Sequence, residues 1–226
     1  MANPVKFYRR MSLYERAKLT SAFGMIFNFI NAIFKIAVGL FTFVAALCIS
    51  GLYSFFTGLA KRVYFRGMRK SGINERKESG YYFAMGLILT VSSVFYIVYM
   101  LRYAFGGSEK AVGFTAFVFV AGIAVADFIF AVGGLMKARR ERDLLSEGLK
   151  LVNLSTSFAA LATAVTAISA LAGMRGETYA VFNGGFGAAM GLVSAVIGFY
   201  MCVKGASYYL RLRGKERVRI IENVKM

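Results

Sequence analysis

Residues 21–60 read SAFGMIFNFINAIFKIAVGLFTFVAALCISGLYSFFTGLA, and Lys35 is the only charged residue among them. A single helix of this length would measure about 60 Å, about twice the thickness of the hydrocarbon core of a bilayer. We therefore expect a hairpin of two membrane-spanning helices that turns near Phe43.

Four further apolar stretches follow in the chain. They cover residues 80–101, 111–136, 151–172 and 178–203, and Asp127 is the only acidic residue inside any of them. The chain as a whole is 58% apolar and 17% charged, whereas soluble domains are about 45–50% apolar and about 25% charged. Backbone groups in lipid must be paired within their own segment, and apolar runs without alternation form helices. The sequence predicts an all-α, polytopic integral membrane protein with a six-helix transmembrane bundle.

The basic residues predict the orientation of this bundle. Of the 28 Lys and Arg residues, 24 lie in segments 1–20, 61–80, 137–150 and 204–226, which share one side of the membrane in a six-helix arrangement. Positive residues are retained on the cytoplasmic side. We expect a cytoplasmic N-terminus (1–20), a transmembrane domain (21–203) and a cytoplasmic tail (204–226) in the cell membrane, without an attached soluble domain.

The net charge of +17 does not indicate nucleic-acid binding, because the basic residues separate the apolar stretches and are not interleaved with base-stacking aromatics. The chain has no histidine, no cysteine cluster and no phosphate-binding glycine loop. We expect no enzymatic activity, no cofactor and no metal site. The expected partner is the lipid bilayer.

Lys35 and Asp127 are charges at membrane depth, where charged side chains are costly and usually functional. Their opposite signs allow them to pair. Alternatively, Lys35 extends toward the membrane surface and Asp127 bonds to a neighbouring hydroxyl. Asn28, Asn31 and Lys35 recur at spacings of three and four, so they share one helix face, which we expect to point into the bundle.

Small residues recur along the last two apolar stretches. Ser155, Ala159 and Thr163 are four apart, and Gly187 and Gly191 form a G-x-x-x-G pair. Such spacings let helix backbones approach closely in a membrane. We expect them to pack helices, and we expect any homodimer to form through the transmembrane helices. A substrate path along the same residues is the alternative.

The first hairpin matches the pattern N-x-x-x-K-x-x-x-G-L-x-T-G-S-x-A-L-x-A-D-x-x-H-S-x-x-D at several positions without a gap. Among them are Asn31, Lys35, Gly39, Thr42, Ala46, Leu47 and Ser54. In this stretch the chain resembles the cation diffusion facilitator family. Residues 146–159, SEGLKLVNLSTSFA, are similar to the family's entry to the fifth helix, and Gly191 and Leu192 match its sixth.

The resemblance fails at the metal site. In the family, the second and fifth helices each supply two ligands to a tetrahedral zinc-type site. The corresponding residues here are Tyr53, Thr57, Ser155 and Ala159. Neutral hydroxyls are poor substitutes for carboxylate or imidazole ligands. The family's cytoplasmic metal-binding domain, which supports its dimer, has no counterpart in these 226 residues.

Three functions remain open at this point. The first is a cation-diffusion-facilitator-like protein without divalent-metal ligands, either a non-transporting scaffold or regulator with an unidentified membrane or cytoplasmic partner, or a homologue with an altered substrate. The second is a secondary transporter of a monovalent cation or small polar solute, coupled through Lys35 or Asp127. Its path would follow Asn31, Tyr53, Thr57, Asn153 and Ser155. The third is a substrate-binding membrane subunit of a larger transport complex.

Overall fold

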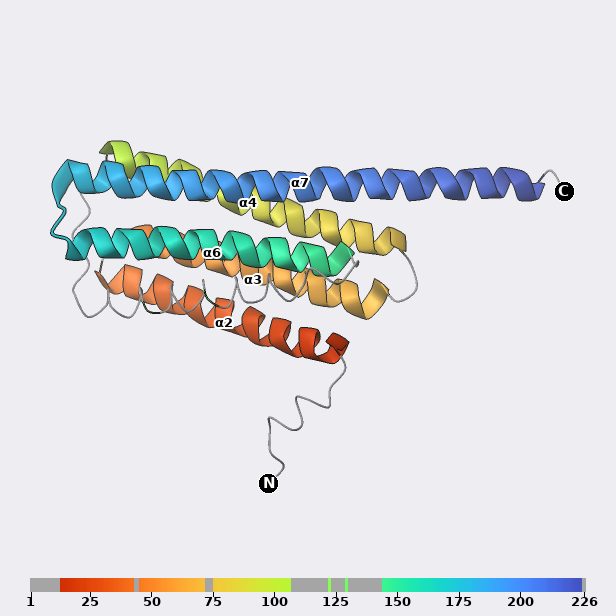
Figure 1. Cartoon of the computed structure of the whole chain (residues 1–226), viewed down its shortest axis with the longest axis horizontal. Coiled ribbons are helices and arrows are strands. Elements are labelled where there is room, and N and C mark those ends of the chain that lie inside the picture. The colour runs from red at the N-terminus through yellow and green to blue at the C-terminus, as the bar shows by residue number, and fades with distance from the viewer. Residues whose placement is uncertain are drawn as a thin grey trace, which may run out of the picture.

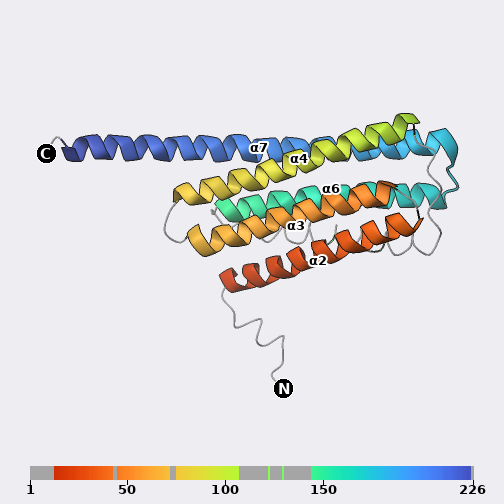
Figure 2. The same cartoon turned by 180° about the vertical axis from the view of Figure 1, so that it is seen from behind.

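The computed structural model describes residues 13–42, 45–71, 75–106, 122, 129 and 144–224. Its long helices are α2 (Leu13–Thr42), α3 (Ala45–Ser71), α4 (Glu75–Gly106), α6 (Leu144–Leu171) and α7 (Gly176–Val224). They run roughly along one axis, with α4 and α7 at one edge, α3 and α6 in the middle and α2 at the other edge (Figures 1 and 2). The described part of the chain contains no strand, so the all-α prediction is confirmed.

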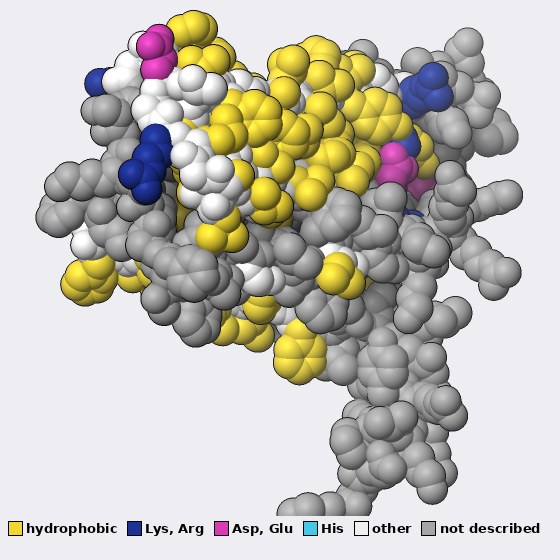
Figure 3. Space-filling view, turned by 60° about the vertical axis from the view of Figure 1, so that its left-hand side comes forward, with side chains coloured by type: hydrophobic (Ala, Val, Ile, Leu, Met, Phe, Trp, Pro, Cys, Tyr) yellow, Lys and Arg dark blue, Asp and Glu magenta, His cyan; other side chains and the backbone are white. Residues whose placement is uncertain are grey.

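The helices of the described residues are compatible with a membrane protein. Four contain segments long and apolar enough to cross a bilayer: Ala22–Phe41, Glu75–Gly106, Leu144–Leu171 and Gly176–Gly214. Large apolar side chains such as Phe41 and Phe105 are exposed, whereas Asn28 and Lys35 are buried. Figure 3 shows a belt of hydrophobic side chains across one face, with charged side chains toward its two ends. In a soluble fold, the large apolar side chains would be buried and the Asn and Lys side chains would be exposed.

The helices contain most of the predicted spans. Asn28 bonds to Thr57 and Lys35 to Ser50, so α2 and α3 run antiparallel, as expected for a hairpin over residues 21–60. The spans predicted at 80–101, 151–172 and 178–203 correspond to α4, α6 and α7. The span predicted at 111–136, including Asp127, lies outside the described residues, apart from helical Gly122 and Ile129. The six-helix count stays a prediction.

The basic segment 61–80 is helical over most of its length, because α3 continues to Ser71 and α4 begins at Glu75. Helical hydrogen bonding is a property of the backbone, so charged residues beyond the apolar stretch do not end a helix. Lys61 is only 5% exposed. Its side chain therefore lies in the interior of the bundle.

All five long helices bring basic segments to the same end of the bundle. At this end α2 begins, α3 ends, α4 and α6 begin, and α7 runs on beyond the other helices (Figure 1). We call it the basic end. At the opposite end, Gly173 and Gly176 adopt positive φ angles of 78° and 67°, which turn the chain from α6 into α7.

Glycines bring α4 and α7 into backbone contact. A Cβ atom on Gly86 would lie 2.8 Å from the carbonyl oxygen of Gly198, and one on Gly198 would lie 3.0 Å from that of Gly86. Gly187 and Gly191 face the side chains of Met100 and Ile97 on α4, respectively. The small-residue stripe of α7 therefore packs against a helix of the same chain.

We expect Gly86→Ala to lower the thermal unfolding midpoint of the purified protein, with a loss of about 1–3 kcal/mol in the free energy of unfolding. The added methyl group would meet backbone atoms of α7, which cannot rotate away. Gly185→Ala is the matched control, because a Cβ there meets nothing within 4 Å. Equal midpoints for the two variants would contradict the close packing.

Candidate functional site

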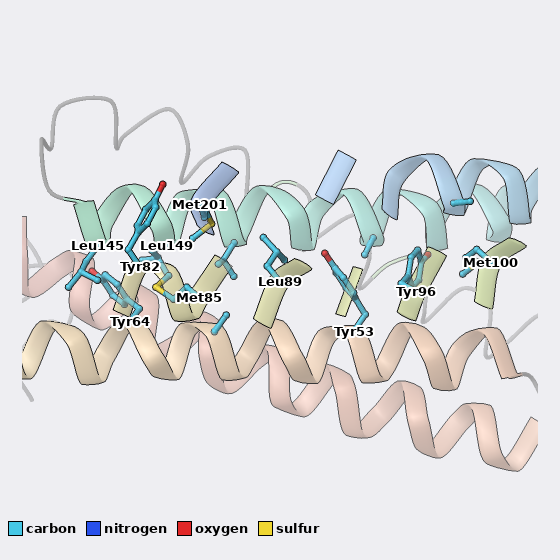
Figure 4. Packing of buried hydrophobic residues seen from close by; sticks show 14 residues of the cluster. Tyr53, Tyr64, Tyr82, Met85, Leu89, Tyr96, Met100, Leu145, Leu149 and Met201 are labelled. Atoms are coloured by element: carbon cyan, nitrogen blue, oxygen red, sulfur yellow. The ribbon is translucent and has the colours of Figure 1, made fainter. Parts of the chain in front are cut away.

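Hydroxyl groups from four helices meet in the interior of the bundle. The Tyr53 hydroxyl of α3 lies beside those of Ser194 (α7), Ser93 (α4) and Ser155 (α6). The Tyr53 ring centroid is 5.4 Å from that of Tyr96 on α4. Figure 4 shows the Tyr53 side chain running from α3 toward α6. We call these five residues the hydroxyl cluster.

The cluster is buried, and four of its hydroxyl oxygens have no well-formed hydrogen bond. Each of the five residues is at most 3% exposed. The side-chain oxygens of Tyr53, Ser93, Tyr96 and Ser155 have no partner of ordinary geometry among the described residues. A buried hydroxyl without a partner costs about 1–3 kcal/mol. A molecule with its own donors and acceptors, placed among these oxygens, would offset that cost.

The chemistry of the cluster is neutral. Each hydroxyl offers one donor and two acceptor positions, so the cluster presents neutral hydrogen-bonding groups of both kinds. Among the described residues, no group of three or more His, Cys, Asp or Glu side chains comes together to hold a metal ion. The described interior therefore offers polar oxygens without a carboxylate or imidazole set for a divalent metal.

The four positions aligned with the family's metal ligands separate into two pairs. Tyr53 and Ser155 meet in the hydroxyl cluster. Thr57 instead donates to the backbone oxygen of Ser54 at 2.9 Å and faces α2. Ala159 is buried in the hydrophobic core. Asn153 is half-buried on α6 and lies two residues from Ser155, so the helical period places it on the opposite side of the helix.

A second set of polar side chains lines the contact between α2 and α3. It consists of Asn28, Asn31 and Lys35 on α2 and Ser50, Ser54, Thr57 and Lys61 on α3, all buried. We call this set the polar seam. Its members recur every three or four residues on both helices, so they form two facing stripes. Asn31, a predicted path residue, lies here and not in the hydroxyl cluster.

The Lys35 ammonium is held inside the bundle by hydroxyls. Its Nζ donates to Ser50 Oγ at 3.3 Å, and Ser50 Oγ shares a hydrogen bond of 3.2 Å with Thr163 Oγ1 on α6. This chain joins α2, α3 and α6. Asp127, the predicted partner of Lys35, lies outside the described residues.

The other buried lysine interacts with Asn28. When the Asn28 amide oxygen faces α3, it accepts from Lys61 Nζ at 3.1 Å, and the amide nitrogen donates to the Gly24 oxygen at 3.2 Å. We assign this orientation because the opposite one would place the amide nitrogen, which is a donor, against the Lys61 ammonium, which is also a donor. Lys61 is thereby a member of the seam, a role that its place in a basic segment did not indicate.

Sequence reasoning missed Ser93, Tyr96 and Ser194. Single Ser and Tyr residues in an apolar stretch carry little signal by themselves. The spacing does carry a signal, because buried residues of α4 recur seven, four and three residues apart along one helix face. These residues are Tyr82, Leu89, Ser93 and Tyr96. Ser194 continues the stripe of Gly187 and Gly191 by a further three residues.

Comparison with known proteins assigns the chain to no family. The chain matches no protein-family model and no curated protein sequence. The relation to the cation diffusion facilitators therefore stays a hypothesis, which rests on the residues of the first hairpin and of α6.

We expect Asn28→Leu to destabilise the protein by about 1–3 kcal/mol, because it removes the amide oxygen that accepts from the buried Lys61 ammonium. Thermal unfolding of the purified protein measures the change. Asn28→Asp retains the acceptor and should lie closer to the parent protein. If leucine were tolerated as well as aspartate, the hydrogen bonds of the seam would contribute no stability.

Proposed function

We propose that this chain is a cation-diffusion-facilitator-like membrane protein whose interior site binds a small polar solute in place of a divalent metal. The observation that carries the proposal is the hydroxyl cluster, in which the buried hydroxyls of Tyr53, Ser93 and Ser155 lie together without well-formed hydrogen bonds. In this proposal the bundle has six transmembrane helices, with both termini at the cytoplasmic face of the cell membrane. The gathering of the basic segments at one end of the bundle supports that orientation.

Charge supports a neutral solute over a divalent cation. Ser50, the hydrogen-bond partner of Lys35, precedes Tyr53 by less than one turn of α3, so the Lys35 ammonium lies near the cluster. In a medium of low dielectric constant a nearby positive charge opposes a second one strongly. Neutral donors and acceptors suffer no such repulsion.

A non-transporting membrane subunit is the second candidate. It is favoured by the packing on both sides of the cluster along the bundle axis, where Met85 and Leu89 lie on one side and Met100 on the other, all buried (Figure 4). In this reading the helix framework serves as a scaffold for a partner protein, and the hydroxyl cluster is what remains of a metal site and binds nothing.

The two candidates predict different results in a ligand screen. We expect the thermal midpoint of the protein in lipid nanodiscs to rise with at least one small polyol, amide or urea-like solute, and we expect Tyr53→Phe to weaken that solute's affinity by about tenfold, the effect of one buried hydrogen bond. Tyr64→Phe is the matched control, because Tyr64 is a buried tyrosine of the same helix outside the cluster.

Other outcomes of this screen are decisive as well. Stabilisation by Na⁺ or K⁺ alone, lost in Tyr53→Phe, would replace the neutral solute by a monovalent cation. Absence of any effect across the panel, or an equal response of the Tyr53 and Tyr64 variants, would favour the non-transporting subunit.

Divalent-metal flux tests the altered site directly. We expect proteoliposomes containing the protein to take up Zn²⁺ and Mn²⁺ no faster than empty liposomes, because hydroxyls and Ala159 stand where the family has charged ligands. Liposomes with a divalent ionophore serve as the positive control. Protein-dependent uptake of either metal would rule out the proposed change of substrate.

A further inference from the structure

An ion pair joins three helices at the basic end of the bundle. Lys204 Nζ on α7 lies 2.7 and 2.6 Å from the two carboxylate oxygens of Glu147, in the first turn of α6. The Tyr82 hydroxyl of α4 donates to the same carboxylate at 3.3 Å. Both charged side chains are 35% exposed. The contact is thus at the border between the bundle interior and water.

A layer of apolar side chains lies between this ion pair and the hydroxyl cluster. Met85, Leu89, Val152 and Met201, from three helices, are all 0% exposed. Along α6, Glu147 precedes Ser155 by about 12 Å, and along α7, Lys204 follows Ser194 by about 15 Å. Figure 4 shows Met85, Met201 and Leu89 between Tyr82 and Tyr53. The ion pair therefore lies on the side of this apolar layer that faces away from the hydroxyl cluster, at the basic end of the bundle.

The contacts of the three helices differ in kind. α4 and α7 touch through their backbones at Gly86 and Gly198, so they form a rigid pair. α6 meets this pair at the basic end through side chains, since Gly148 faces the Tyr82 ring and Glu147 faces Lys204. Moving the first turns of α6 away would break the ion pair and side-chain contacts and would leave the α4–α7 contact intact.

We propose that Glu147, Lys204 and Tyr82 form the latch of an inner gate, which opens the hydroxyl cluster to the aqueous phase at the basic end when α6 separates from α4 and α7. The inference rests on the proposed solute site. A partly exposed ion pair is weak enough to break and re-form repeatedly, whereas separating a fully buried pair is strongly unfavourable. Methionine side chains in the layer below can repack during such a movement.

Cysteine labelling tests the gate without any solute. The full chain carries Ser155→Cys in a background of Cys48→Ser and Cys202→Ser, which removes both free cysteines. A charged, membrane-impermeant methanethiosulfonate is applied to the protein in nanodiscs. We expect Glu147→Gln to speed the labelling of position 155 about fivefold, the effect of losing one partly exposed ion pair. The exchanged pair, Glu147→Lys with Lys204→Glu, should restore the slow rate.

Two controls separate a gate from a general stabilising contact. Glu177→Gln, in the first turn of α7 at the opposite end, should leave the labelling rate unchanged. Ala180→Cys, a buried position at that opposite end, reports loosening of the whole bundle. If Glu147→Gln speeds labelling at both cysteines, or at neither, the gate is refuted. Faster labelling at position 155 alone supports the gate, even if no solute in the screen binds, and only the solute proposal then fails.

Discussion

Polar groups that lie in hydrocarbon must find their partners within the protein, and this requirement governs the bundle. Backbone groups meet it inside each helix. Side chains meet it across helices, as when Lys35 binds Ser50 and Ser50 binds Thr163. The Asn28 amide oxygen accepts from Lys61 of α3 in the same way. The polar seam therefore specifies the register between α2 and α3, because a slip by one residue would separate every one of these pairs and leave the groups buried.

The hydroxyl cluster is a place in the described chain where several neighbouring side chains do not meet the same requirement. It lies among helices whose packing leaves little freedom to adjust, since α7 and α4 are in backbone contact through Gly86 and Gly198. A serine on a mobile surface would rotate toward the nearest acceptor or toward water. The helices that carry Ser93 and Ser155 hold the Cα atoms of both residues in place instead, so the two hydroxyls stay close to Tyr53.

The sequence predicts the helices well and their ends and interior contacts less well. Apolar runs of membrane length leave no alternative to helices, so α2, α3, α4, α6 and α7 could be anticipated. The burial of Lys61 could not be anticipated, because the pattern of charges says how far the apolar stretch extends and not where the helix stops. Tyr53 and Ser155 were found through a family resemblance that aligns positions. Their neighbours Ser93, Tyr96 and Ser194 could not be found that way, since they come from helices that supply no ligand in the family pattern.

The length of α7 has a mechanical consequence. Its 49 residues form one continuous helix, about 73 Å long, and it extends beyond the basic end past every other long helix (Figure 1). An unbroken helix moves as a stiff rod, so its far end shares every tilt of its apolar half. About 39 Å of helix separate Gly198, where α7 touches the backbone of α4, from Val224. A small rotation about that contact point is therefore amplified into a larger displacement outside the bundle.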